Sequence, residues 1–198
     1  MINIVKSAIT AVILSVIFFS ISLHAETVDF PEKIQIDEQR SVPFRNYAVF
    51  APVSFSLYAI GLYVAGTETD NMKLKNSDEP MAIQLVSLYR RLKMKTLIDE
   101  LRRGFSYGMD HDKKFLKTIQ ERIDDFIKLL ENTGKNPRKY NTITFLYVPK
   151  EGTHVSFRSE YLGTIPGHDF KKALFGIWLN NNCANDELRD RVIKIRKK

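Results

Sequence analysis

Two residues in the first third of the chain are of types that could hold an anion together. Arg45 lies near the start of the apolar, β-prone segment "RNYAVFAPVSFSLYAIGLYVAG", and Tyr58 lies in its second half. A guanidinium group binds a carboxylate through two parallel hydrogen bonds, and a phenol can donate a third. The segment therefore predicts an anion site, provided that its two halves pair as a hairpin that brings these side chains together.

The register of this hairpin decides whether the two side chains meet. If the turn is a two-residue loop at positions 51–52, Arg45 lies directly opposite Tyr58, with Cβ atoms about 5 Å apart. Proline at position 52 cannot take the positive φ of a type I′ turn, so the turn can instead centre on positions 52–53. Arg45 then faces Ile60, with Tyr58 as its diagonal neighbour. In both registers Arg45 and Tyr58 lie on the same face of the hairpin, whereas a three-residue loop would change this arrangement.

The face that carries Arg45 and Tyr58 is otherwise mostly apolar, and we expect Tyr47, Ile60 and Leu62 to form the wall of a pocket. A buried guanidinium needs an anion or several acceptors. No acidic residue of the two strands shares this face, so an anionic ligand head is one candidate partner. The alternative is that Arg45 extends to solvent or meets an acidic group from elsewhere.

The elements that would position these residues follow from periodicity. Alternating or continuous apolar runs predict strands, and apolar residues at helical spacing predict helices. The predicted strands are residues 27–36, 44–50, 54–65, 81–89, 142–148, 153–158 and 160–165, and the predicted helices are 93–108, 110–134, 166–179 and 186–192. Segment 66–80 is polar and expected to be a loop. This order predicts an α+β fold, a large antiparallel sheet with a layer of helices on one face.

The amino terminus has the pattern of a secretory signal peptide. A single lysine is followed by an uncharged apolar run, and Ala25 offers a cleavage point. The alternative is an uncleaved membrane anchor. We therefore expect a signal peptide over 1–25, a single domain over 26–198 and a periplasmic location. The single Cys183 excludes an internal disulfide and a zinc site of several thiolates.

No nucleotide-binding or hydrolase motif is present. The "DHD" and "GHD" sequences lie at predicted helix starts, where aspartate caps a helix, so we expect no metal and no cofactor. The net charge of +7 comes partly from the basic segments "YRRLKMK", "ELRRGF" and "RDRVIKIRKK". These predict solvated faces or contact with an anionic membrane surface. Nucleic acid is not expected as a partner, because no binding motif occurs.

Two distant segments, "LYAIGLYVAG" and "LGTIPGHDFKKALFGIWLNNNCANDELRDRV", resemble the chalcone isomerase-like family. The resemblance implies an open-faced β-sandwich. In the isomerases an arginine holds the substrate oxyanion, and a threonine just before A-I-G polarises the ketone. Arg45 matches that arginine, whereas the spacing of many bacterial members would place Phe50 there. Tyr58 stands at the threonine position, as in the fatty-acid-binding branch, where an arginine and a tyrosine hold the carboxylate.

The resemblance favours a binding protein, expected to be a monomer, whose ligand is a fatty acid or a similar small amphipathic anion in a cleft between sheet and helices. Arg45 and Tyr58 would hold the ligand head. Two alternatives stay open. One is an intramolecular lyase or isomerase, in which the arginine stabilises an oxyanion. However, the isomerases carry a tyrosine and an asparagine on a helix that here reads "MKTLIDELRRGF", and this segment contains neither residue type. The other is a non-catalytic envelope protein that contacts membrane or a partner through its basic segments.

Overall fold

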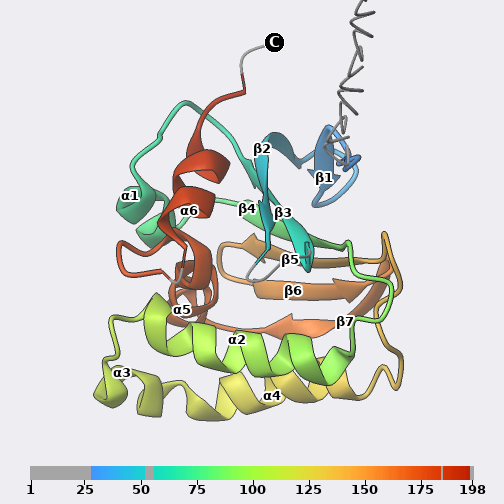
Figure 1. Ribbon diagram of the computed structural model, residues 1–198. Helices are drawn as coiled ribbons and strands as arrows, with labels where there is room; N and C mark the ends of the chain where they lie inside the picture. Colours follow the sequence, from blue (N-terminus) through green and yellow to red (C-terminus); the bar gives the residue numbers. More distant parts are fainter. Residues whose placement is uncertain (1–27, 52–55, 184, 197–198) are drawn as a thin grey trace, which may run out of the picture.

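The chain forms one antiparallel sheet with helices packed against it, in a computed structural model that describes residues 28–51, 56–183 and 185–196 (Figure 1). The seven strands follow one another in chain order, β1-β2-β3-β4-β5-β6-β7, and each pairs antiparallel with the next. The strands are β1 Lys33–Gln35, β2 Ser41–Phe50, β3 Tyr58–Val64, β4 Met81–Ser87, β5 Thr142–Val148, β6 Gly152–Phe157 and β7 Glu160–Ile165. The predicted α+β class is therefore confirmed.

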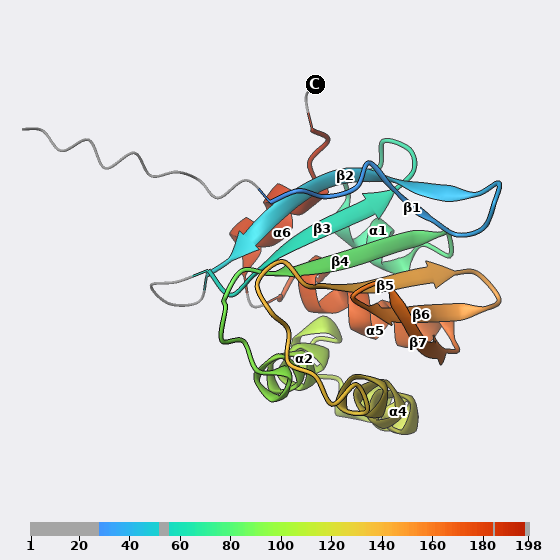
Figure 2. The same cartoon turned by 90° about the vertical axis from the view of Figure 1, so that its right-hand side faces the viewer.

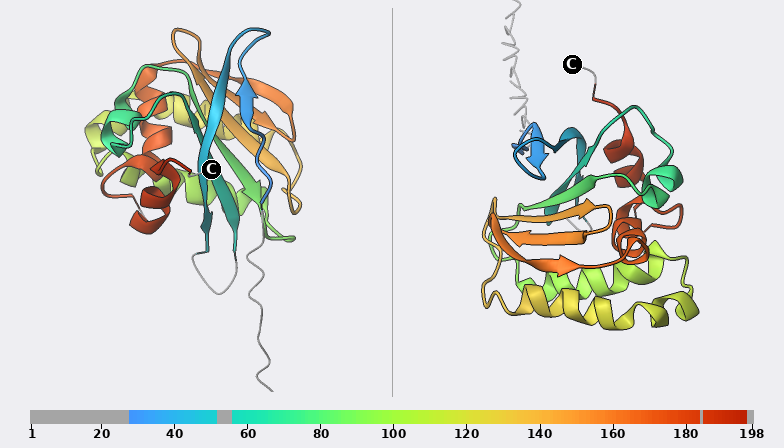
Figure 3. Two further views of the ribbon diagram at one scale, coloured as in Figure 1. Left: turned by 90° about the horizontal axis from the view of Figure 1, so that it is seen from above. Right: turned by 180° about the vertical axis from the view of Figure 1, so that it is seen from behind.

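The helices lie against one face of the sheet, which curls around them (Figures 2 and 3). They are α1 Asn71–Asn76, α2 Met94–Gly108, α3 Lys113–Thr118, α4 Gln120–Glu131, α5 His168–Leu179 and α6 Asp186–Ile193. Helix α5 lies on the sheet and packs against α2, while α4 contacts β7 and α6 contacts β2. No helix in the described ranges has the length and apolarity needed to cross a bilayer.

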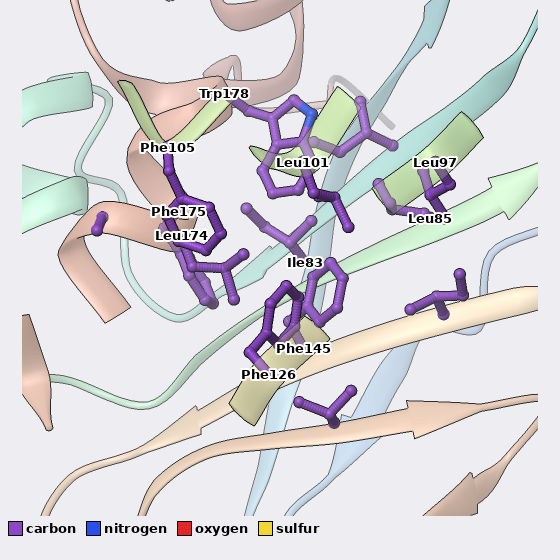
Figure 4. Close-up of a cluster of buried hydrophobic side chains, with 14 of the residues drawn as sticks. Ile83, Leu85, Leu97, Leu101, Phe105, Phe126, Phe145, Leu174, Phe175 and Trp178 are labelled. Carbon is purple, nitrogen blue, oxygen red and sulfur yellow. The ribbon is translucent and has the colours of Figure 1, made fainter. Parts of the chain in front are cut away.

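The main hydrophobic core lies between the sheet and the helices (Figure 4). Helix α2 buries Leu97, Ile98, Leu101 and Phe105, which recur at the three- and four-residue spacing of one helical face. Figure 4 shows Leu97 and Leu101 of α2 converging with Trp178 of α5 above the strands. This convergence brings the sheet, α2 and α5 together where a ligand site would form.

The opposite face of the sheet is covered in part by the segment that precedes β1. Phe30 stacks on Phe44, with ring centroids 5.4 Å apart, and also packs against Tyr47. Gly61 makes this possible, because a Cβ atom there would lie 2.5 Å from the Phe30 ring. Residues 58–64 are buried on both faces for this reason, which explains why β3 is apolar without alternation.

Three local predictions were wrong. Segment 66–80 contains the short helix α1, which Asp70 begins by accepting a hydrogen bond from the Lys73 N–H. The single helix expected over 110–134 is broken at Ile119, whose backbone leaves the helical region and separates α3 from α4. The strand expected over 27–36 is reduced to β1. The predicted signal peptide, residues 1–25, lies outside the described residues.

Candidate functional site

A cavity of about 230 Å³ lies between the ends of β2 and β3 and helices α2, α5 and α6. Its wall is mostly apolar, with a few polar groups. It is lined by Phe50, Tyr58, Leu97, Glu100, Leu101, Arg103, Gly104, Tyr107, Ile177, Trp178, Cys183, Asn185 and Leu188. A concave apolar site with a small number of convergent polar groups is the usual form of a small-molecule site.

Tyr58 places a hydrogen-bonding hydroxyl in the depth of this cavity. Its Oη atom accepts a hydrogen bond from the indole N–H of Trp178 at 3.2 Å, and its residue is 6 % exposed. Burial raises the pKa of the Tyr58 phenol above its ordinary value, so the group stays protonated at neutral pH. No acceptor for the phenol proton is found among the described residues. Tyr58 is therefore positioned to donate to an oxygen atom of a ligand.

The charged groups of the lining lie nearer to solvent. Arg103 donates to the carboxylate of Glu100 at 2.5 Å, and their side chains are 61 % and 33 % exposed. The carboxylate of Glu100 also contributes to the raised pKa of Tyr58. Burial raises the pKa of the Cys183 thiol, which lowers the fraction of thiolate at neutral pH. The cavity thus has a neutral interior and an ion pair at its opening.

The register predicted for the hairpin was wrong. Strand β2 pairs with β3 so that Phe50 faces Tyr58 and Ala48 faces Ile60, and the Phe50 ring stacks on the Tyr58 ring at 5.0 Å. The two turns predicted from the sequence, at residues 51–52 and 52–53, both include positions outside the described residues. Because Phe50 pairs with Tyr58, seven positions lie between the paired residues instead of two. The difference is an odd number, and such a change of register moves every side chain of one strand to the other face.

Arg45 lies far from Tyr58. It lies five positions before Phe50 along β2, which corresponds to about 16 Å of strand, and Phe50 is the residue that faces Tyr58. Its guanidinium donates instead to three backbone carbonyls after β3, those of Ala65, Gly66 and Glu68, and the Gly66 bond is 2.8 Å long. The strand bulges at this position, between Phe44 and Asn46. Several carbonyl acceptors therefore satisfy the buried guanidinium. Burial lowers the pKa of Arg45, and the charge of Glu68 opposes this effect.

The other predicted wall residues also lie outside the cavity lining. Tyr47 lies on the opposite face of the sheet, where it packs against Phe30. Ile60 and Leu62 lie on the helix side, as expected, but both are fully buried in the main core. The alternative from family spacing, in which Phe50 stands at the position of the family's arginine, agrees with the observed pairing of Phe50 with Tyr58. Of the predicted site residues, only Tyr58 lines the cavity.

Arg103 and Trp178 are two of the lining residues that the sequence did not identify as site residues. Arg103 lies within the basic segment "ELRRGF", which suggested only a charged helix face. Trp178 is the only tryptophan of the sequence and belongs to the segment that carries the family resemblance. A signal was therefore present, but the pairing of Trp178 with Tyr58 joins residues 120 positions apart and depends on the tertiary fold.

The two aspartate–histidine motifs have structural roles at helix starts. Asp112 accepts a hydrogen bond from the Phe115 N–H and caps α3. Asp169 forms a bidentate ion pair with Arg122, at 2.6 and 2.7 Å, and this pair joins α4 to α5. In the described ranges, no group of three or more histidine, cysteine, aspartate or glutamate residues is arranged to hold a metal ion.

The sheet, its helical layer and this cavity define an open-faced β-sandwich with a pocket at one end. A family model described as chalcone isomerase-like matches residues 22–193, and the chain therefore belongs to the chalcone isomerase-like family. Among solved structures, a fatty-acid binding protein of Arabidopsis thaliana matches with a TM-score of 0.58 and 16 % sequence identity, over 83 % of this chain and 90 % of that chain. Similarity at this identity supports the shared fold alone. A search of curated proteins found no match.

Proposed function

We propose that this protein binds a small amphipathic carboxylate, of which a short fatty acid is the simplest example, in the cavity beside Tyr58. The observation that carries the proposal is an apolar cavity whose lining combines one exposed cation, Arg103, with a buried phenol, Tyr58, for which no acceptor is found among the described residues. The same fold in a fatty-acid binding protein supports a ligand of this class. The proposal retains Tyr58 from the sequence analysis and replaces Arg45 as the predicted partner of the carboxylate.

The distribution of charge favours one orientation of the ligand. A carboxylate beside Tyr58 would lose its hydration in exchange for one neutral donor, and the carboxylate of Glu100 would repel it. Arg103 is the cation of the cavity lining, and its guanidinium has donors beyond the one that Glu100 uses. We therefore place the ligand carboxylate at Arg103 and the apolar chain toward Trp178. An oxygen along that chain could accept from Tyr58.

The size of the cavity limits the ligand. Small-molecule pockets usually enclose about 300–1,000 Å³, and this cavity is smaller, at about 230 Å³. Burial of six methylenes contributes about 5 kcal/mol at ~0.8 kcal/mol each. Together with one charge-assisted hydrogen bond, this corresponds to a dissociation constant between millimolar and micromolar. Short and medium chains should therefore bind better than long ones.

The test is a fluorescence titration with saturated fatty acids of increasing length. Trp178 is the only tryptophan and lines the cavity, so its emission reports occupancy. The Arg103→Gln variant should weaken binding about tenfold. The matched control is Arg102→Gln, because Arg102 lies outside the cavity lining and pairs with Asp124 at 3.8 Å. Equal affinities of the two variants, or no saturable signal in the wild type, would overturn the proposal.

An isomerase reaction is less well supported by this geometry. Stabilising a buried oxyanion requires donors or cations where the charge develops, and the depth of the cavity offers the Tyr58 hydroxyl, with the guanidinium of Arg103 nearer to solvent. Formation of a flavanone from a chalcone by the wild type, with loss of turnover in Tyr58→Phe, would favour the isomerase instead.

We also propose that the chain is exported and that residues 1–25 are removed. The support is the pattern of a single lysine, an uncharged apolar run and Ala25. Fractionation of the producing cell and Edman sequencing of the mature protein test this. A mature protein that begins at Glu26 and is released with the periplasmic fraction is expected, and a cytoplasmic protein that keeps Met1 would contradict it.

A further inference from the structure

A second concave site lies beside the start of α2 and is strongly basic. Its volume is about 420 Å³, and none of its lining residues is shared with the cavity beside Tyr58. We call it the basic cleft. It is lined by Arg90, Arg91, Leu92, Lys93, Lys135, Asn136, Pro137, Arg138 and Arg158. Six of these nine side chains are cations, and none is acidic.

The fold gathers these cations from three connections that are far apart in the sequence. The first connection follows β4, the second follows α4 and leads into β5, and the third joins β6 to β7. All three meet at the same end of the strands, because neighbouring strands are antiparallel. Backbone bonds hold the connections together: the Tyr140 N–H donates to the Ser87 carbonyl at 2.7 Å, and the Arg158 N–H donates to the Thr142 carbonyl at 2.9 Å. Figure 1 shows the first two connections running side by side at the right-hand edge.

Asn136 joins the basic cleft to the start of α2. Its side-chain oxygen accepts from the Met94 N–H at 2.9 Å, which supplies the cap that Lys93, the residue at the N-cap position, does not provide. The positive end of the α2 dipole therefore lies beside the cleft and adds to its positive potential. The backbone hydrogen bonds and this cap fix the connections that carry the cations.

The positive charge of the cleft is largely uncompensated. Lys135 forms an ion pair with Glu160, at 3.6 Å. Within the described part of the chain, no acidic partner is found for the other five cations, which are all exposed. Like charges gathered in one concave site repel one another and concentrate counter-ions. A bound anion would relieve this repulsion.

Arg158 occupies a position where the backbone favours other residues. It forms the two-residue turn between β6 and β7 with Ser159, and their φ angles are 53° and 65°. Such turns favour asparagine and glycine, because the left-handed region is unfavourable for larger side chains. An arginine at this turn contributes a cation to the cleft at a cost in backbone conformation, which is an arrangement typical of functional sites.

We infer that the basic cleft binds a compact anion that carries phosphate groups. Four of its six cations are arginines, whose planar guanidinium groups bind phosphate oxygens in pairs. The cleft is concave and of small-molecule size, which suits a phosphate group or a phosphorylated headgroup. This inference goes beyond the proposed function, because it concerns another site and another ligand chemistry. Phosphate of this kind could come from a soluble molecule or from a lipid headgroup, and the experiment separates the two sources.

The test uses two probes and two charge-matched double variants. Isothermal titration with inorganic pyrophosphate measures the soluble source, and co-sedimentation with phosphatidylcholine vesicles, with or without phosphatidylglycerol, measures the lipid source. The test variant is Arg91→Gln with Arg158→Asn, since asparagine tolerates the left-handed turn. The control is Lys113→Gln with Lys114→Gln, which removes the same charge from exposed positions of α3 outside the cleft.

The inference predicts saturable binding of one probe by the wild type and by the control, weakened at least about tenfold in the test variant. Binding of pyrophosphate identifies a soluble anion as the source. Binding to phosphatidylglycerol vesicles alone identifies a lipid headgroup. Binding of neither probe, or equal losses in the two double variants, would overturn the inference. A fatty-acid titration of the same test variant should be unchanged, which separates this inference from the proposed function.

Discussion

Replacing Arg45 by methionine separates its structural role from the ligand-binding role that the sequence suggested. Methionine keeps an unbranched apolar stem but has no donor. The carbonyls of Ala65, Gly66 and Glu68 would lose the guanidinium that they now share. We therefore expect Arg45→Met to destabilise the fold at the β2 bulge and to leave the cavity beside Tyr58 intact.

The expected loss of stability follows from the three hydrogen bonds. A hydrogen bond to a charged group contributes about 1.5–3 kcal/mol when both partners are buried. The 3.3 Å bond to Ala65 is weak, and all three acceptor residues are exposed, so water can replace the lost donor in part. A net loss of about 2 kcal/mol remains. For a domain of this size, that corresponds to a fall in Tm of about 4–8 °C.

Urea denaturation followed by Trp178 fluorescence measures the stability, and a fatty-acid titration of the folded variant measures affinity. Because Arg45 lies about 16 Å along β2 from Phe50, the residue that faces Tyr58, affinity should change by less than about twofold. A variant of unchanged stability that has lost fatty-acid binding would refute this reasoning and restore Arg45 as the carboxylate anchor.

Three further changes test the cavity and its supports. Tyr58→Phe should lose about 1–3 kcal/mol of stability, because the buried indole N–H of Trp178 loses its acceptor. It should weaken ligands that carry an oxygen along the chain, such as oxo acids, more than it weakens plain fatty acids of equal length; equal weakening in paired titrations would argue against donation by the phenol. Gly108→Ala should lose about 1–3 kcal/mol in urea denaturation, because a Cβ atom there would lie 2.6 Å from the Ala173 carbonyl oxygen; an unchanged midpoint would show that α2 and α5 can separate freely. Burial lowers the pKa of Lys171 to about 7, whereas the pKa of a lysine in the unfolded chain is about 10.4. Since the unfolded state then binds more protons between these values, the stability of the wild type relative to Lys171→Met should rise from about pH 7 to 10, and a difference independent of pH would contradict the lowered pKa.

The strands and the amphipathic helices could be predicted from the sequence because their signals are local. The stripe of Leu97, Leu101 and Phe105 identifies the buried face of α2 from spacing alone. Asn185 caps α6 by accepting from the Leu188 N–H, and asparagine is a residue type favoured at this position. Helix α1 has six residues, and too few of them are apolar to produce a periodic pattern.

The candidate site was only partly predictable, because it depends on the length of one connection. Arg45 or Ala48 shares a face with Tyr58 according to whether the loop between β2 and β3 has an even or an odd number of residues. Neither the proline nor the apolar pattern fixes that number. A bulge at Arg45, between Phe44 and Asn46, then interrupts the alternation of side chains along β2. The pairing of Trp178 with Tyr58 arises only when α5 packs across the sheet.

The most direct test of the central claim is quenching of Trp178 by brominated fatty acids, since bromine quenches an indole that it contacts. A medium-chain acid brominated at its methyl end should quench strongly, and the same acid brominated beside its carboxylate should quench weakly. Leu188→Phe, which adds volume to the cavity wall, should reduce both signals. Strong quenching only by the acid brominated beside its carboxylate would contradict the proposed orientation, and no quenching by either acid would contradict binding in this cavity.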